Sequence, residues 1–267
     1  MAYLSQLFGL EDKTVFLTGA SSGIGEHWAE TLCNAGCRRL ALLARRTDKL
    51  EVVAQQLRAK FPGLKVCAVA LDVGKDAKTI AEAFDKAELA LGGNVTFDVI
   101  INNAGVGPSA SVMNATAESM DSTMDINVRG PMLVTQEASR RMIARKVTNG
   151  SVINVASIYG FRVGFNNAVY ATSKAALVQL TKAMAIELLG NGIRVNAIAP
   201  GYYRSEMTSE FYDSPKGQKY LQSKVPSKRL GLLPELDGPL VLLCSNASSN
   251  MTGTVVVADG GHLTSSL

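Results

Sequence analysis

A tyrosine and a lysine lie one helical turn apart in the segment Tyr170-Ala-Thr-Ser-Lys174. Residues at this spacing share one face of a helix. A free tyrosine has a pKa near ~10 and is a poor acid or base at neutral pH. A neighbouring ammonium group favours the phenolate and would lower that pKa, so the pair predicts acid–base chemistry. The spacing alone is also common on ordinary amphipathic helices, which is the alternative interpretation.

Two further polar residues favour the chemical interpretation. Ser157 directly follows an apolar run at 151–156, and its hydroxyl could hydrogen-bond a substrate carbonyl at the end of a strand. Asn127 lies within a long helical pattern at about 118–145. A buried amide there needs a partner, such as a backbone group or a water molecule.

A glycine-rich turn follows the first apolar run of the chain and reads Thr18-Gly-Ala-Ser-Ser-Gly-Ile-Gly25. Glycines let the backbone approach a pyrophosphate closely, and the N–H groups and dipole of a helix start favour its negative charge. Such a turn can also be purely structural. Its place between the first strand and the first helix favours a dinucleotide site.

The second apolar run ends at Ala44 and is followed by Arg45 and Arg46. An acidic residue near this place usually binds the free ribose hydroxyl of NAD. A neutral residue followed by arginines instead suits the 2′-phosphate of NADP, because a guanidinium can bond two oxygens at once. We therefore expect NADP(H) in preference to NAD(H), with a solvated arginine pair as the alternative.

Alternation of short apolar runs with longer helical patterns predicts the fold. Strands that are apolar on both faces and separated by helices indicate a parallel sheet covered on both sides. The pattern predicts one doubly wound α/β Rossmann domain over residues 1–267 with a seven-stranded parallel sheet. The expected strands are 13–18, 39–44, 65–71, 97–102, 151–156, 194–199 and 254–258, and the expected helices start near 23 and cover about 47–60, 75–91, 118–145, 168–190 and 234–245.

Composition excludes several classes of protein. The chain has 267 residues, 47% hydrophobic, with a formal net charge of +4, so it is neither disordered nor strongly basic, and we expect no nucleic-acid partner. No apolar run reaches the ~18 residues of a membrane span. The four cysteines show no CxxC or zinc spacing, so we expect buried thiols, no metal site and a cytoplasmic location.

The segment 201–231 lacks clear apolar periodicity and contains several aromatic residues. It follows the sixth expected strand, and ligands in such folds bind beyond the carboxyl ends of the strands. We therefore expect this segment to cover the substrate. A surface loop whose aromatic residues pack on its own helices is the alternative.

Six motifs occur in register along the chain: TGASSGIG at 18–25, LDV at 71–73, NNAG at 102–105, the set Asn127, Ser157, Tyr170 and Lys174, APG at 199–201 and ADGG at 258–261. Over essentially its whole length the chain thus resembles the short-chain dehydrogenases/reductases. The resemblance implies NAD(P)-dependent interconversion of a carbonyl and an alcohol by a homotetramer. It implies that Tyr170 is the general acid of ketone reduction, that Lys174 lowers its pKa and holds the nicotinamide ribose, that Ser157 positions the carbonyl, and that Asn127 holds a water of the proton relay.

The same resemblance implies the residues that bind the cofactor. They are Gly19, Ser21, Ser22, Gly23, Ile24 and Gly25 at the phosphates and ribose, Arg45 and Arg46 at the 2′-phosphate, Asp72 and Val73 at the adenine, Asn103, Ala104 and Gly105 along the cofactor, and Pro200, Gly201, Tyr203 and Ser205 near the nicotinamide. Two of these depart from the family pattern. Tyr203 stands where Val or Ile is usual, and Ser205 where Thr is frequent.

The substrate is less well determined. The segment 199–208 looks most like the gluconate 5-dehydrogenase branch, whose substrates are keto sugar acids, and Arg162, Arg204 or Lys224 could pair with a carboxylate. A 3-oxoacyl-acyl-carrier-protein reductase is the close alternative, with Arg129, Arg140 and Arg141 as a docking patch for an acidic carrier. Steroid or xenobiotic ketone reduction and a non-catalytic NADP-binding sensor remain as further alternatives.

Overall fold

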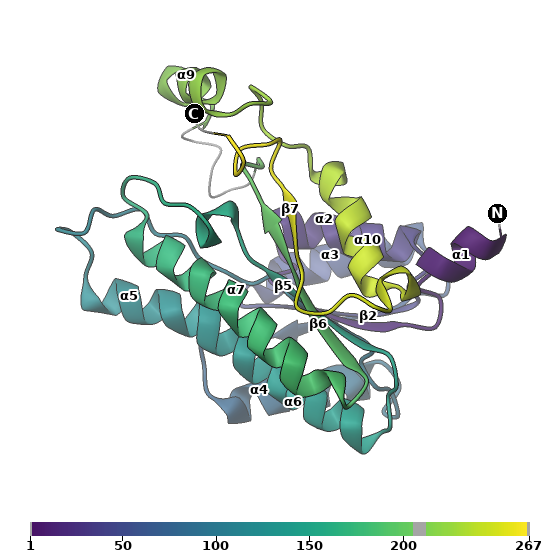
Figure 1. Cartoon of the computed structure of the whole chain (residues 1–267). Helices are drawn as coiled ribbons and strands as arrows, with labels where there is room; N and C mark the ends of the chain where they lie inside the picture. Colours follow the sequence, from purple (N-terminus) through teal and green to yellow (C-terminus); the bar gives the residue numbers. More distant parts are fainter. Residues whose placement is uncertain (1, 205–211, 266–267) are drawn as a thin grey trace.

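The computed structural model describes residues 2–204 and 212–265 of the chain. Seven parallel strands form one sheet in the order β3-β2-β1-β4-β5-β6-β7, surrounded by helices (Figure 1). This confirms the predicted doubly wound fold. The strands are β1 (Thr14–Thr18), β2 (Arg39–Ala44), β3 (Lys65–Ala70), β4 (Val99–Asn102), β5 (Gly150–Val155), β6 (Ile193–Pro200) and β7 (Val255–Ala258).

The α-helices are α1 (Ala2–Phe8), α2 (Gly23–Asn34), α3 (Thr47–Lys60), α4 (Ala77–Ala90), α5 (Ala117–Met124), α6 (Gly130–Ala144), α7 (Ala168–Leu189), α9 (Pro215–Lys224) and α10 (Asp237–Cys244). Short 3₁₀ turns span Ile158–Gly160, Leu233–Leu236 and Asn246–Ser248. Helix α1 was not expected from the sequence. In the part of the chain that the structure describes, no helix combines the length and apolar character needed to cross a membrane.

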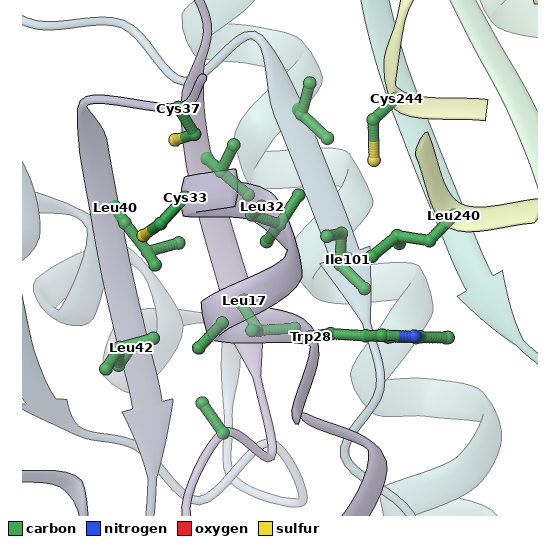
Figure 2. Packing of buried hydrophobic residues seen from close by; sticks show 14 of the residues in the cluster. Leu17, Trp28, Leu32, Cys33, Cys37, Leu40, Leu42, Ile101, Leu240 and Cys244 are labelled. Atoms are coloured by element: carbon green, nitrogen blue, oxygen red, sulfur yellow. The ribbon is translucent and has the colours of Figure 1, made fainter. Parts of the chain in front are cut away.

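Alternate residues of each strand face opposite layers of helices. Leu17 of β1 and Leu42 of β2 pack against α2, α3 and α10, where Trp28 and Leu240 are fully buried (Figure 2). Phe16 of β1 points to the other face, where α4, α6 and α7 cover the sheet. Two-sided burial explains why the strands read as continuous apolar runs.

The four cysteines are buried free thiols, as expected. Three of them, Cys33, Cys37 and Cys244, lie in the core on the α2 side (Figure 2). Burial raises the pKa of the Cys33 and Cys37 thiols to about 12. They therefore stay protonated at neutral pH and act as small apolar side chains.

The long helix expected at 118–145 is in fact interrupted. Helices α5 and α6 are joined by a π-helical turn, Asp125–Arg129, that carries Asn127. Pro131 lies in the first turn of α6 and has no N–H to donate to the carbonyl four residues earlier, so the turn widens. Apolar periodicity runs through this point, which is why the sequence predicted one helix.

Candidate active site

The strand order reverses between β1 and β4, so the carboxyl ends of these strands border a crevice. Thr18 ends β1, and its hydroxyl donates to Ile101 O at 3.2 Å and accepts from the Asn103 and Ala104 N–H groups, both at 3.1 Å. The Asn103 amide donates back to the carbonyls of Thr18 and Gly19, each at 3.0 Å. The glycine turn and the NNAG segment are therefore fastened together.

Glycine is required at position 19 by conformation and by space. Its φ is +68°, and a Cβ there would lie 2.8 Å from the Ala104 Cα. A Cβ on Gly25 would meet the Gly19 carbonyl. Gly25 is not among the residues that line the cleft. Its missing side chain lets α2 pack against the turn, and a contact of Gly25 with a cofactor stays a prediction.

A cleft of about 530 Å³ opens at the carboxyl edge of the sheet. Most of the site residues expected from the sequence line it, namely Gly19, Ser21, Ser22, Gly23, Ile24, Arg45, Arg46, Asp72, Val73, Asn103, Ala104, Gly105, Ser157, Tyr170, Lys174, Pro200, Gly201 and Tyr203. Ala44, Leu71, Val106, Ile126, Val155 and Ala156 also line it and were not expected. Ser205 lies outside the described residues.

Asn127 does not line the cleft itself but makes two hydrogen bonds to the backbone of Val106, which does. Its Oδ1 accepts from the Val106 N–H at 2.9 Å, and its Nδ2 donates to the Val106 carbonyl at 2.8 Å and to Ser173 Oγ at 3.0 Å. The expected backbone partner is confirmed. The side chain is fully buried, so it fixes the segment after Gly105 against α7.

Ser157, two residues after β5, and Tyr170 of α7 face the cleft. Burial raises the pKa of Tyr170, and the nearby Ser157 hydroxyl acts in the opposite direction. The net direction is upward because burial is the largest cause, and the expected lowering by Lys174 stays a prediction. A neutral phenol of this kind holds its proton at neutral pH and can donate it.

Lys174 is buried below Tyr170, with its Nζ 5.7 Å from the centre of the phenol ring. The same Nζ donates to the Val155 carbonyl at 2.7 Å. Burial lowers the pKa of Lys174 to about 8. A Cβ on Gly105 would lie 3.5 Å from this Nζ. Because Gly105 has no side chain, the Lys174 ammonium group is not covered from this side of the cleft.

The start of α2 has the features of a phosphate site. Ser22, the residue before the helix, makes no side-chain hydrogen bond to the first N–H groups of α2. Helix starts of this kind present unsatisfied donors and a positive dipole end to an anion. The residues present therefore fit the pyrophosphate of a dinucleotide.

Arg45 and Arg46 are exposed at the mouth of the cleft beside this turn. Arg46 Nη2 donates to Ser22 Oγ at 2.6 Å and to Ser21 Oγ at 3.3 Å. Across the cleft, Asp72 Oδ1 accepts from the Gly74 N–H at 3.0 Å and closes a tight turn. The end of the cleft beside the glycine turn thus carries two arginine cations, which we call the ribose end. The Asp72 carboxylate there already accepts a hydrogen bond from a backbone N–H group two residues later.

A cluster of phenols lies beside Tyr170, on what we call the substrate side of the cleft. The hydroxyls of Tyr159 and Tyr202 lie 2.9 Å apart, and those of Tyr202 and Tyr220 lie 3.1 Å apart. The Tyr159 ring packs edge-on against Tyr170 at 6.0 Å. Tyr220 belongs to α9, which projects beyond the sheet in Figure 1, so the described part of 201–231 includes a helix connected to the catalytic region.

Tyr203, which departs from the family pattern, and Arg204, a candidate partner of a substrate carboxylate, both have partners within the protein. Tyr203 is buried, and its hydroxyl donates to the Ala258 carbonyl at 3.1 Å. Arg204 forms a two-point ion pair with Asp213, at 2.6 and 3.0 Å. Because its charge is already matched, Arg204 is a poor candidate for binding a substrate carboxylate.

Comparison with known proteins agrees with this geometry. A family model described as enoyl-(acyl carrier protein) reductase matches residues 19–262. The 2-dehydro-3-deoxy-D-gluconate 5-dehydrogenase of Bacillus subtilis is 32% identical over 98% of this chain and 99% of its own. A 3-oxoacyl-[acyl-carrier-protein] reductase of Thermotoga maritima is 34% identical over 94% of this chain and 98% of its own.

Among solved structures, a gluconate 5-dehydrogenase from Burkholderia cenocepacia in complex with NADP and tartrate has a TM-score of 0.90 at 28% identity. The match covers 98% of this chain and 99% of that one. The family model thus spans most of the chain, and the relatives span nearly all of it. The chain belongs to the short-chain dehydrogenase/reductase family and is an NAD(P)-dependent oxidoreductase of CH–OH groups.

Proposed function

We propose that this enzyme interconverts a ketone and a secondary alcohol with NADP(H), and that its substrate is a keto sugar acid. The observation that carries the proposal is the placement of Ser157, Tyr170 and Lys174 in one cleft with the glycine turn and Arg45. The cleft thereby joins proton-donating groups to a dinucleotide site. Relatives that act on gluconate derivatives support the substrate class.

The protein's own part in the reaction follows from these groups. A bound NADPH supplies the hydride. Tyr170 donates its phenolic proton to the carbonyl oxygen of the substrate, and Ser157 hydrogen-bonds the same oxygen. Lys174 stabilises the phenolate that remains, because its ammonium lies below the ring. In the reverse direction the phenolate takes the proton from the alcohol.

Preference for NADP(H) rests on the charges at the ribose end of the cleft. Arg45 and Arg46 lie there, and β2 ends at the neutral Ala44 rather than at a carboxylate. Arginine donors match the oxygens of a 2′-phosphate. The Burkholderia enzyme, whose structure holds NADP, supports the same preference.

Reduction of a 3-oxoacyl thioester is the second candidate, favoured by the Thermotoga relative. The expected docking patch for an acidic carrier gives it little support, because its arginines already have acidic partners. Arg129 pairs with Asp125, Arg140 pairs with Glu137, and Arg141 pairs with Asp85, Glu88 and Glu137. The Burkholderia enzyme is in complex with tartrate, a hydroxy acid, which favours the sugar-acid candidate.

Substitution of Tyr170 by Phe tests the catalytic proposal and separates it from an NADP-binding sensor. We expect the variant to lose at least ~10³-fold in kcat while binding NADPH with unchanged affinity, because only the proton donor is removed. Turnover is followed by NADPH absorbance and binding by fluorescence. Retained ketone reduction would contradict the assigned acid, whereas a sensor would keep its binding response without any wild-type turnover.

The expected tetramer rests on the family resemblance, and the expected cytoplasmic location rests on the cysteine pattern. A cytoplasmic homotetramer stays a prediction. Light scattering on the purified protein checks the tetramer, and a mass of one or two chains would contradict it.

A further inference from the structure

Arg162 occupies a particular place on the substrate side of the cleft. It follows the 3₁₀ turn Ile158–Gly160, which begins directly after Ser157. Its Nη1 donates to the His262 carbonyl at 2.6 Å, so the guanidinium lies between the β5–α7 connection and the segment after β7. The side chain is half-buried. The cation of Arg162 is therefore close in sequence to Ser157 and to Tyr159, whose ring packs against Tyr170.

No carboxylate pairs with Arg162 among residues 2–204 and 212–265. Arg204 differs, because both of its terminal nitrogens bond Asp213. A guanidinium has five N–H donors in a planar fork, and the structure uses one of those of Arg162. The remaining donors match the two oxygens of a carboxylate.

Two polar side chains lie within reach of the Arg162 charge. Burial raises the pKa of Tyr159 and Arg162 opposes this, whereas burial and Arg162 both lower the pKa of His262. Tyr159 also packs against the Tyr170 ring and shares a hydrogen bond with the Tyr202 hydroxyl. Tyr159 therefore connects Arg162 and Tyr202 to the ring of the proton donor.

His262 provides a second, independent indication of a ligand. Its side chain is 1% exposed, and its Nδ1 is buried with no hydrogen-bond partner in the described part of the chain. The ring packs against Tyr202 at 5.1 Å. A buried polar nitrogen without a partner is costly, and a polar ligand bound beside Arg162 would satisfy it.

We propose that Arg162, His262, Tyr159 and Tyr202 form a subsite for the carboxylate end of a hydroxy acid. Arg162 binds the carboxylate, and the hydroxyls and imidazole bond the adjacent hydroxyl groups of the chain. The inference rests on the proposed function and adds the residue that selects acids over uncharged ketones. Arg162 is thus a specificity-determining residue, distinct from the proton donor.

A purely structural role is the competing explanation, since Arg162 also fastens the segment that carries His262. Arg162→Gln separates the two, because Gln keeps an N–H donor for the His262 carbonyl and removes the charge. The matched control is Arg204→Gln, which removes another arginine charge, one that is already paired with Asp213. Thermal unfolding of both variants verifies that the fold is kept.

The experiment measures NADPH oxidation with 5-keto-gluconate and with its uncharged methyl ester. We expect Arg162→Gln to raise the KM for the acid about 10- to 100-fold, with kcat within about threefold and the ester unaffected. Calorimetric binding of gluconate to the enzyme with NADP⁺ should weaken equally, and Arg204→Gln should change neither reading.

Equal losses with acid and ester would assign Arg162 a structural role and overturn the proposal. An unchanged KM for the acid would overturn it too, while leaving the proposed function intact. If the wild-type enzyme does not reduce the acid at all, the proposed substrate is wrong and the subsite is rejected with it. The three failures are therefore distinguishable.

Discussion

The cofactor side and the substrate side of the cleft are held together in different ways. On the cofactor side, Thr18 and Asn103 join the ends of two adjacent buried strands through backbone groups. On the substrate side, phenol hydroxyls from Tyr159, Tyr202 and Tyr220 join segments that are distant in sequence. The first arrangement depends on the sheet, and the second depends on individual side chains.

Packing shows the same difference. The residues beneath the cofactor side belong to the two large clusters that cover the sheet. Tyr212, Leu221 and Val225 instead form a small separate cluster under α9, with Tyr202 and Tyr220 against it. Substitutions on the substrate side should therefore change specificity at small cost in stability, whereas the cofactor side should resist change.

Lys174 lies where the two sides meet, and its replacement should have the largest effect. We expect Lys174→Met to lower kcat at least ~100-fold, because the phenolate of Tyr170 loses the only ammonium group beneath its ring in the described chain. Steady-state kinetics at saturating NADPH and substrate measure this. The conservative Lys174→Arg is the control, and full activity of Lys174→Met would remove Lys174 from the mechanism.

The same variant should gain stability. Burial lowers the pKa of Lys174 to about 8, against an ordinary 10.5, which costs the folded state roughly 3 kcal/mol when the lysine is charged. The cost is complete below pH 8 and disappears as the pH rises toward 10.5, because the unfolded chain then also loses the proton. Lys174→Met should therefore unfold at a higher urea concentration than wild type at pH 7. A variant that is less stable at pH 7 would contradict this cost.

Arg45 tests the cofactor side alone. We expect Arg45→Asp to weaken NADPH binding about 10- to 100-fold and to leave NADH binding within a few-fold, because only NADPH carries the 2′-phosphate. Fluorescence titration with each cofactor measures the ratio. Arg38→Asp is the matched control, since Arg38 is exposed just before the other end of β2. Equal weakening of both cofactors would show that Arg45 does not select the phosphate.

Tyr202→Phe tests the substrate side and should have the smallest effect. Its hydroxyl is shared by Tyr159 and Tyr220, so its loss should cost about 1 kcal/mol of unfolding free energy and raise the substrate KM a few-fold. NADPH affinity should not change. Tyr3→Phe, at an exposed tyrosine of α1, is the control. A large loss of NADPH affinity in Tyr202→Phe would show that the two sides are not independent.

The sequence predicted which residues meet on the cofactor side of the cleft, because the signals there are local. Strand ends, the glycine turn and Arg45 follow one another along the chain, and parallel strands bring them to one edge. The helical spacing of Tyr170 and Lys174 likewise placed both in the cleft. The raised pKa of Tyr170 was not predicted, since its main cause is burial, which depends on the whole fold.

The substrate side was predicted less well because its contacts are long-range. Nothing in the local pattern pairs Arg204 with Asp213 or brings Arg162 to His262, which are 100 positions apart. The segment 201–231 was expected to cover the substrate, and its described part holds α9 and the phenol cluster. The π-helical turn at Asn127 was not predicted, because Pro131 removes a backbone hydrogen bond of the helix without changing the spacing of the apolar residues.

The most direct test of the proposed function is NADPH oxidation by the purified wild-type enzyme with 5-keto-gluconate and with an acetoacetyl thioester in parallel. We predict turnover of the sugar acid, with a kcat/KM at least ~100-fold above that of the thioester. The reverse preference would contradict the sugar-acid proposal and assign the enzyme to 3-oxoacyl reduction.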